Sequence, residues 1–478
     1  MNITLSLVSH TNAGKTTLAR TLLGRDIGEV RDEAHVTLEA ERHTMVEAPQ
    51  GERLELWDTP GFGDSVRLAK RLERAGNPIG WFLTEVWDRF RDRAFWSSQR
   101  AVRNIVDEAD VVLYLVNASE APQDAGYLEA ELRVMALIGK PVIVLLNQLG
   151  PPASPQEEAA EVERWRGALH ASPCVRAVLA LDAFARCWVQ EGRLLDAVAS
   201  ALPADRQAAM QHLHGAWRER GRATWHASMA VLAQRLCRAA LDREALPPAD
   251  WTGRLSELGA ALGLRRDGPV TPRERAMQTL AERLDADIRQ STDRLIALHG
   301  LGGHASEIVL QRLAEHYAVE EPVSEGKAAL WGGVVSGALA GLKADIASGG
   351  LTMGGGLLAG GVIGALTAAG AARGVNLLRG VEVATIAWDE AVLDDLARSA
   401  LLGYLAVAHY GRGRGDWTPS EHPPFWRDAV AEVVAPRRAA LQDIWARRDR
   451  PDLEAALQAW LVDASAALLK RLYPAAHI

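Results

Sequence analysis

The front of the chain, up to Pro203, alternates short apolar runs with helical segments. The apolar runs are bounded by turn residues and have the length of buried strands, at 3–8, 54–59, 111–119, 141–148 and 175–181. Segments between them, such as 15–24, repeat their apolar residues every three or four positions, as amphipathic helices do. Strands that alternate with helices form a parallel sheet covered by helices on both faces. The pattern therefore predicts an α/β fold with a mostly parallel sheet over 1–203.

The pattern changes after Pro203, where the strand-like runs stop. From there apolar residues recur at helical spacing almost to the end of the chain, in a background rich in Ala, Leu, Arg and Glu. Proline and glycine pairs interrupt this pattern at 247–248, 268–269 and 423–424. We therefore expect mainly α-helical structure behind the sheet, with helical regions at 204–328 and 379–478.

One segment, from Ala329 to Gly374, is crowded with glycine and alanine. Its glycines include two trios with a spacing of four, which would form flat stripes on helices, at Gly333, Gly337 and Gly341 and at Gly356, Gly360 and Gly364. We expect a glycine-rich helical hairpin at 329–378. The uncharged run 351–372 is long enough to cross a bilayer, although Gly and Ala contribute little to membrane insertion. Two interpretations stay open: the hairpin contacts a membrane through 329–374, or it packs tightly in a soluble protein.

Composition and charge narrow the class of protein. The 478 residues are 48% hydrophobic and 24% charged, which is typical of packed globular proteins. A net charge of −8 argues against general nucleic-acid binding, which needs a cationic face. Cys174, Cys187 and Cys237 lie far apart, which indicates reduced thiols. Because the first residues also lack a basic leader, we expect a cytoplasmic protein, peripherally associated with the inner membrane if the hairpin contacts lipid.

The first candidate for chemistry is the stretch VSHTNAGKTTL at 8–18. A strand leads into a turn that ends in Gly-Lys-Thr and continues as a helix, which is the arrangement of a phosphate-binding loop. Gly14 would let the backbone approach the phosphates, and the amides that begin at Ala13 would surround the β-phosphate. Lys15 would place a cation on the β- and γ-phosphate oxygens, and the Thr16 hydroxyl would bind Mg²⁺.

This motif departs from the usual pattern at its start. Ser9 stands where the first glycine is expected, and because serine is small we expect an impaired fit at worst. Thr17, in the first turn of the helix, belongs to the same set of nucleotide-binding residues. The alternative is a chance Gly-Lys-Thr after a strand, which the motifs that follow in the right order argue against.

The second motif, LELWDTPGFGD, begins at Leu54. Its strand delivers Asp58, which would hold Mg²⁺ through water, and the next turn would present the Gly61 amide to the γ-phosphate. Between the two motifs, Thr37 is the candidate for a switch threonine that contacts Mg²⁺ only while the γ-phosphate is present. We assign Lys15, Thr37 and Gly61 to catalysis. The alternatives are an ordinary turn at Asp58 and an ordinary strand threonine at Thr37.

Together, TNAGKTTL and WDTPGF resemble the Era/HflX-type branch of the translation-factor-related P-loop GTPases. The chain as a whole resembles an uncharacterised bacterial family with such a domain at the front and a helical domain of unknown function behind it. The rear resemblance depends on the glycine-rich hairpin and on GRGRGDWTPSEHPPFWRDAV at 411–430. The resemblance implies a P-loop NTPase fold, GTP as the ligand, Mg²⁺ as the cofactor and GTP hydrolysis to GDP and phosphate.

Asn12 and Phe62 match the residues found in that branch of GTPases. Phe62 stands where Ras-like GTPases have the glutamine that orients the attacking water, and a phenyl ring cannot hydrogen-bond to water. The chemistry therefore needs another source of transition-state stabilisation. The resemblance implies that a K⁺ ion held partly by Asn12 supplies the positive charge that an arginine finger would bring. Asn12 could instead stabilise its own turn.

The base-recognition motif differs from the family pattern Asn-Lys-x-Asp. The apolar run at 141–148 ends in Asn147 and Gln148, but Gly150 offers no carboxylate for guanine. Losing such a charge-assisted pair costs about 3 kcal/mol, or about a hundredfold in discrimination. Asp182, after the next run, would restore a carboxylate or would instead cap a helix. Asn147, Gln148 and Asp182 are therefore the candidate base contacts, and guanine preference comes from the resemblance.

Three functions stay open. The first is a slow, Mg²⁺-dependent GTPase switch whose helical half reads the nucleotide state for an unknown protein partner. The second is a membrane-associated GTPase with dynamin-like logic that uses the glycine-rich hairpin. The third is a nucleotide binder that does not hydrolyse, favoured by Ser9, Phe62 and Gly150 together. In each case two GTPase domains could face each other in a homodimer.

Overall fold

The structure, a computed structural model, describes residues 1–10, 13–24, 27, 40–62, 65–74, 93–149, 154–181, 187–245, 272–301, 385–410 and 425–475. The chain divides into two compact units. Unit 1 comprises Met1–Trp225, Ala408–Trp426 and Leu469–Ile478, and unit 2 comprises His226–Val407 and Arg427–Leu468. The glycine-rich hairpin expected at 329–378 lies outside the described residues.

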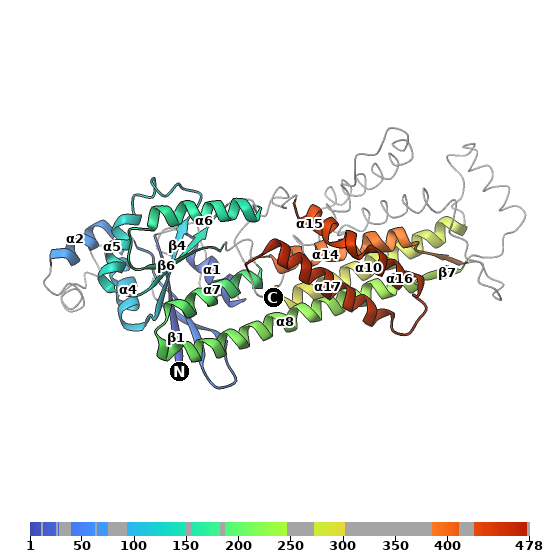
Figure 1. The fold of residues 1–478 in the computed structure, drawn as a ribbon, viewed down its shortest axis with the longest axis horizontal. Coiled ribbons are helices and arrows are strands. Elements are labelled where there is room, and N and C mark those ends of the chain that lie inside the picture. The colour runs from blue at the N-terminus through green and yellow to red at the C-terminus, as the bar shows by residue number, and fades with distance from the viewer. Residues whose placement is uncertain are drawn as a thin grey trace, which may run out of the picture. The chain divides into compact units, whose positions relative to one another are not determined.

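Unit 1 contains a six-stranded sheet in the order β2-β3-β1-β4-β5-β6. Figure 1 labels β1, β4 and β6 of this sheet. The strands are β1 Asn2–Ser9, β2 Glu41–Glu47, β3 Arg53–Asp58, β4 Val111–Asn117, β5 Val142–Asn147 and β6 Val175–Ala180. All neighbouring pairs are parallel except β2 and β3, which are antiparallel. The predicted α/β fold with a mostly parallel sheet is therefore confirmed.

Helices cover both faces of this sheet. They are α1 Lys15–Leu23, α2 Ser65–Arg74, α4 Arg93–Glu108, α5 Leu128–Ile138, α6 Pro155–Leu169 and α7 Trp188–Ala201, followed by the first part of α8 Ala204–Leu241. Side chains of β4 alternate between two apolar clusters, because successive residues of a strand point to opposite faces. Val112 and Tyr114 join one cluster with α4, α5 and α6, whereas Leu113 and Leu115 join the other with α1, α7 and α8.

Unit 2 is largely helical, as predicted. It contains the end of α8, β7 Arg243–Ala245, α10 Pro272–Leu298, β8 Thr385–Ala387, a short 3-10 turn at Ala435–Arg437 and α16 Arg438–Ala446. It also contains most of α14 Glu390–Ala408, α15 Phe425–Val434 and α17 Leu453–Leu472. The expectation that strands stop after Pro203 was wrong, since β7 pairs antiparallel with β8. A three-residue strand has no periodicity of its own, and this one depends on a partner that is distant in sequence. Among the described residues, none of the helices combines the length and the apolarity needed to cross a membrane.

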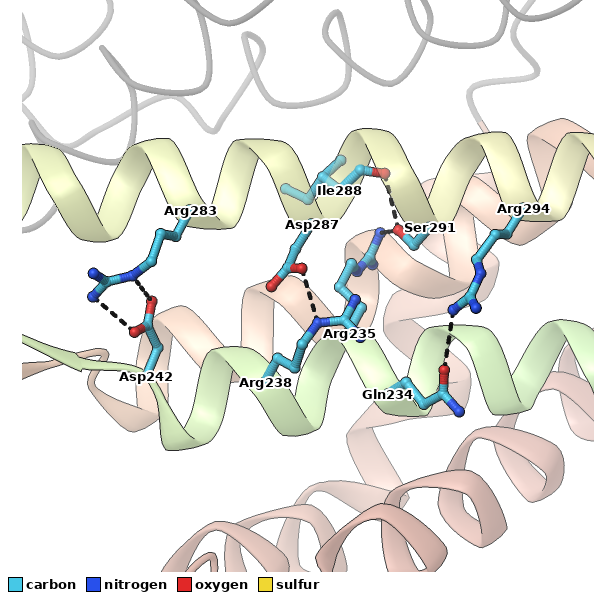
Figure 2. Close-up of polar contacts among 9 residues, drawn as sticks. All are labelled: Gln234, Arg235, Arg238, Asp242, Arg283, Asp287, Ile288, Ser291 and Arg294. Atoms are coloured by element: carbon cyan, nitrogen blue, oxygen red, sulfur yellow. Dashed lines mark hydrogen bonds and ion pairs between the residues drawn. The ribbon is translucent and has the colours of Figure 1, made fainter.

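Polar side chains join α8 to α10 within unit 2 (Figure 2). The contacts pair Arg283 with Asp242, Arg238 with Asp287, Arg294 with Gln234 and Arg235 with Ser291. The Arg238–Asp287 pair is 2.8 Å long, and Arg283 also reaches Glu244 at 2.7 Å. The ion pairs of Arg238 and Arg283 remain accessible to water and add little stability, so they mainly fix how the two segments align.

His299, directly after α10, makes the stability of unit 2 depend on pH. Burial lowers the pKa of His299 to about 4, and its Nε2 lies 3.3 Å from the Ser228 hydroxyl. The unfolded chain therefore takes up a proton at higher pH than the folded chain, and stability falls as the pH drops from about 6.5 towards 4. We expect this residue to lower the unfolding free energy by about 1 to 2 kcal/mol between about pH 7 and about pH 5.

Urea unfolding of the wild type and His299→Gln at both pH values measures this contribution. Glutamine keeps an amide near the position of Nε2 but does not titrate, so this variant loses that part of the pH dependence. The same pH dependence in both proteins would contradict the assignment.

Candidate functional site

The loop between β1 and α1 lies at the carboxyl edge of the sheet, where open α/β sheets hold their ligands. Gly14 precedes α1 with a φ of +87°, a left-handed conformation that favours glycine. A Cβ atom at Gly14 would lie only 2.8 Å from Asn147 Nδ2. Backbone conformation and close packing therefore both require glycine at this position.

Lys15 and Ser9 contact each other inside this loop. The Lys15 side chain is almost completely buried, and its Nζ donates to Ser9 Oγ over 2.9 Å. Burial lowers the pKa of Lys15, while the nearby Asp58 and Glu131 carboxylates oppose that shift. The Ser9 hydroxyl in turn donates to the carbonyl of His10. The serine that replaces the expected glycine thus gives the lysine ammonium a partner that glycine lacks.

Asp58 ends β3 beside the first turn of α1. Its Oδ2 accepts a 2.7 Å hydrogen bond from Thr16 Oγ1, and its Oδ1 is buried with no hydrogen-bond partner in the described part of the chain. Burial raises the pKa of Asp58, while the Thr16 hydrogen bond and Lys15 act against it. A buried carboxylate oxygen needs a partner, and hydroxyl and carboxylate oxygens are the ligands that Mg²⁺ prefers. The residues present therefore fit a magnesium ion.

Two hydrogen bonds connect the turn after β3 to β1. Thr59 Oγ1 donates to the carbonyl of Leu7 at 2.7 Å, and the Phe62 amide donates to the carbonyl of Ser9 at 2.9 Å. The Phe62 ring is fully buried in an apolar cluster of unit 1. These contacts place Gly61 beside the loop, whereas the Phe62 ring is used for packing.

The Asn147 side chain connects the end of β5 to the phosphate-binding loop. Its buried side chain donates from Nδ2 to the carbonyl of Ala13 over 2.8 Å. The next residue, Gln148, has a φ of +58°, which is rare outside glycine. Asn147 was predicted as a base contact, and the structure shows its amide on the phosphate-binding loop.

A buried network beside the loop was not predicted. Glu131, on α5, is fully buried; its Oε1 lies 2.7 Å from His10 Nδ1 and its Oε2 accepts from the Tyr114 hydroxyl at 2.7 Å. Burial raises the pKa of Glu131, and the contact with His10 opposes this shift. One signal was present in the sequence, because Glu131 falls on the apolar stripe of α5 between Leu128 and Leu132.

The structure thus brings Ala13, Gly14, Lys15, Thr16 and Thr17 together with Asp58, Gly61, Asn147 and Gln148 at one edge of the sheet. Thr17 is buried in the first turn of α1. The other predicted residues, Asn12, Thr37 and Asp182, lie outside the described residues. Within the described ranges, no three or more His, Cys, Asp or Glu side chains form a group that could hold a metal ion.

Parts of the chain are similar to solved structures at low sequence identity. Era in complex with MgGDPNP and part of 16S ribosomal RNA is 18% identical with a TM-score of 0.31, over 42% of this chain and 57% of that one. An Aquifex aeolicus Era variant bound to GDP.AlF4⁻ is 16% identical with a TM-score of 0.30, over 52% and 74%. The bacterial selenocysteine-specific elongation factor EF-Sec is 16% identical with a TM-score of 0.26, over 44% and 28%. The chain thus spans little more than half of the first Era structure.

Two known protein families match different parts of the chain. Residues 4–148 match a family described as 50S ribosome-binding GTPase, and residues 171–459 match a domain of unknown function, DUF3482. None of the curated proteins matches the chain. Because the second match spans more than half of the 478 residues, the chain belongs to the DUF3482 family, with a P-loop GTPase domain ahead of that domain.

Proposed function

We propose that unit 1 binds GTP with Mg²⁺ and hydrolyses it slowly, and that the helical half reads the nucleotide state. The observation that carries this proposal is the cluster of Lys15, Thr16 and Asp58 at the start of α1. The start of a helix attracts phosphate through its amides and its dipole. The match of 4–148 to a GTPase family supports the same ligand class.

We propose a role for each of these residues. Lys15 offers its ammonium to the β- and γ-phosphate oxygens, and the amides from Ala13 to Thr16 surround the β-phosphate. Thr16 and Asp58 would hold Mg²⁺, which when bound neutralises charge on the phosphate oxygens. The Gly61 amide is the proposed donor to the γ-phosphate. Thr37 completes the proposed catalytic set as the switch threonine.

Base selection and the potassium site stay predictions. Asn147, which ends β5, and Gln148, which follows it, are the proposed base contacts, with Asp182 as the proposed source of a carboxylate. Phe62 is buried and cannot orient water, so hydrolysis needs another source of transition-state stabilisation. We propose K⁺ held partly by Asn12 for this role.

The wider organisation is also proposed. We place the GTPase domain at 1–203, helical regions at 204–328 and 379–478, and a glycine-rich hairpin at 329–378. A protein partner that responds to the nucleotide state, membrane contact through 329–374 and a homodimer of facing GTPase domains are proposals of the same kind.

The function is tested with the purified full chain by measuring its affinity for GTP, GDP, ATP and XTP, with and without Mg²⁺, followed by turnover of the tightest triphosphate. We expect GTP to bind most tightly and Mg²⁺ to strengthen that binding. Tight binding of a triphosphate with no phosphate release in either KCl or NaCl would identify a binder that does not hydrolyse. Failure of every purine nucleotide to bind would overturn the proposal.

Asp58→Asn tests the magnesium site. The amide keeps an oxygen for the Thr16 hydroxyl but lacks the negative charge that a divalent ion needs. We expect the strengthening of GTP binding by Mg²⁺ to fall about tenfold, because a charge-assisted contact is lost. Asp107→Asn, an exposed carboxylate that pairs with Arg103 on α4, is the matched control and should behave as wild type. An unchanged response to Mg²⁺ in Asp58→Asn would contradict the assignment.

A further inference from the structure

The buried carboxylate of Glu131 has no part in the nucleotide chemistry proposed above. It is fully buried, and both of its oxygens contact polar groups, His10 on one side and Tyr114 on the other. A buried carboxylate is costly unless it is paired and hydrogen-bonded, so its position in the core of unit 1 needs a reason. Tyr114 lies on a central strand and gives the carboxylate a fixed partner.

His10 connects this carboxylate to the phosphate-binding loop. Its ring stacks on Tyr127, with centroids 4.3 Å apart and an angle of 10° between the planes. The His10 carbonyl accepts from the Ser9 hydroxyl, which itself accepts from Lys15 Nζ. A continuous series of contacts therefore leads from Glu131 through His10 and Ser9 to the lysine ammonium.

The loop is held from two sides. Asn147 binds the carbonyl of Ala13 at the helix end of the loop, and Glu131 binds the side chain of His10 at the strand end. A binding loop must keep its groups within a fraction of an ångström of their working positions, and the residues around it supply that rigidity. The contact with Asn147 fixes only one of the two ends.

We propose that Glu131 is a positioning residue for the phosphate-binding loop: by holding His10 it sets the Ser9–His10 backbone and the hydroxyl on which the Lys15 ammonium rests. This inference depends on the proposed function, because it assigns Glu131 to the same polyphosphate site. The competing explanation is that Glu131 only stabilises the core through Tyr114.

Affinity for GTP with Mg²⁺ and thermal stability, measured on the full chain, separate these explanations. His10→Ala removes the group that Glu131 holds, and we expect affinity to fall about tenfold, as for one hydrogen bond to a charged group. His10→Asn places an amide donor near the position of Nδ1, and we expect it to stay within about threefold of wild type. Both changes are on a partly exposed side chain, so both variants are expected to fold.

Glu131→Leu should weaken GTP binding by about the same factor, and the Glu131→Leu/His10→Ala double variant no further, because both changes break one contact. Tyr114→Phe removes the hydrogen bond that the Glu131 carboxylate accepts on its other oxygen. It should lower the melting temperature without changing the affinity for GTP. The inference would be overturned if His10→Ala kept wild-type affinity, or if His10→Asn lost as much affinity as His10→Ala. It would also be overturned if the losses multiplied in the double variant, or if Tyr114→Phe lost as much affinity as Glu131→Leu. A wild type that binds no triphosphate would instead refute the proposed function, and this inference with it.

Discussion

Replacing Lys15 with alanine is expected to abolish useful nucleotide binding. The ammonium is the cation that meets the phosphates, and two carboxylates, Asp58 and Glu131, lie close enough to influence its pKa. Without Lys15 these carboxylates would face an incoming polyphosphate with no opposing charge, so repulsion adds to the lost attraction. We expect the affinity for GTP with Mg²⁺ to fall at least about a hundredfold, and turnover to fall with it.

Isothermal titration and thermal shift measure this loss directly. Lys15→Met keeps the apolar stem that packs in the buried site and removes only the charge, so it should lose affinity to a similar extent. Lys470→Ala, an exposed lysine at the end of α17, is the matched control and should bind as wild type. If both Lys15 variants keep wild-type affinity while folded, this loop is not the nucleotide site.

The central strands of the sheet were predictable because their sequences are apolar almost throughout. β4 and β5 are buried along nearly their whole length, which is the condition that gives an uninterrupted apolar run. β2 lacked that signal, since only Met45 and Val46 in it are buried. An edge strand gains its backbone hydrogen bonds from a neighbour, here β3, and its side chains can stay polar.

The candidate site was predictable where its residues are close in sequence. Gly14, Lys15 and Thr16 form one short motif, and Asp58 ends a recognisable strand. The contacts that hold the loop are different, because Asn147 reaches Ala13 across 134 positions and Glu131 reaches His10 across 121. Such contacts depend on the order of the strands in the sheet, which periodicity does not reveal.

Gly14→Ala is expected to reduce GTP affinity as strongly as Lys15→Ala does. It acts by distorting the phosphate-binding loop through backbone strain and a steric clash. The residue has a φ of +87°, and an added Cβ would lie 2.8 Å from Asn147 Nδ2. Left-handed backbone costs alanine about 1 to 2 kcal/mol, and relief of the clash requires the Asn147 amide to shift, which disturbs its hydrogen bond to the Ala13 carbonyl. We therefore expect lower thermal stability and a loss of GTP affinity of at least about a hundredfold, because the amides no longer converge on the phosphates.

Gly139→Ala separates backbone strain from the clash. Gly139 ends α5 with a φ of +79°, and an added Cβ there meets nothing within 4 Å. This variant should lose a similar amount of stability through strain alone, about 1 to 2 kcal/mol, and keep wild-type affinity for GTP. Equal affinity losses in the two variants would mean that loss of stability, and not the geometry at Gly14, controls binding. Wild-type affinity in Gly14→Ala would show that the loop does not need the close contact between Gly14 and Asn147.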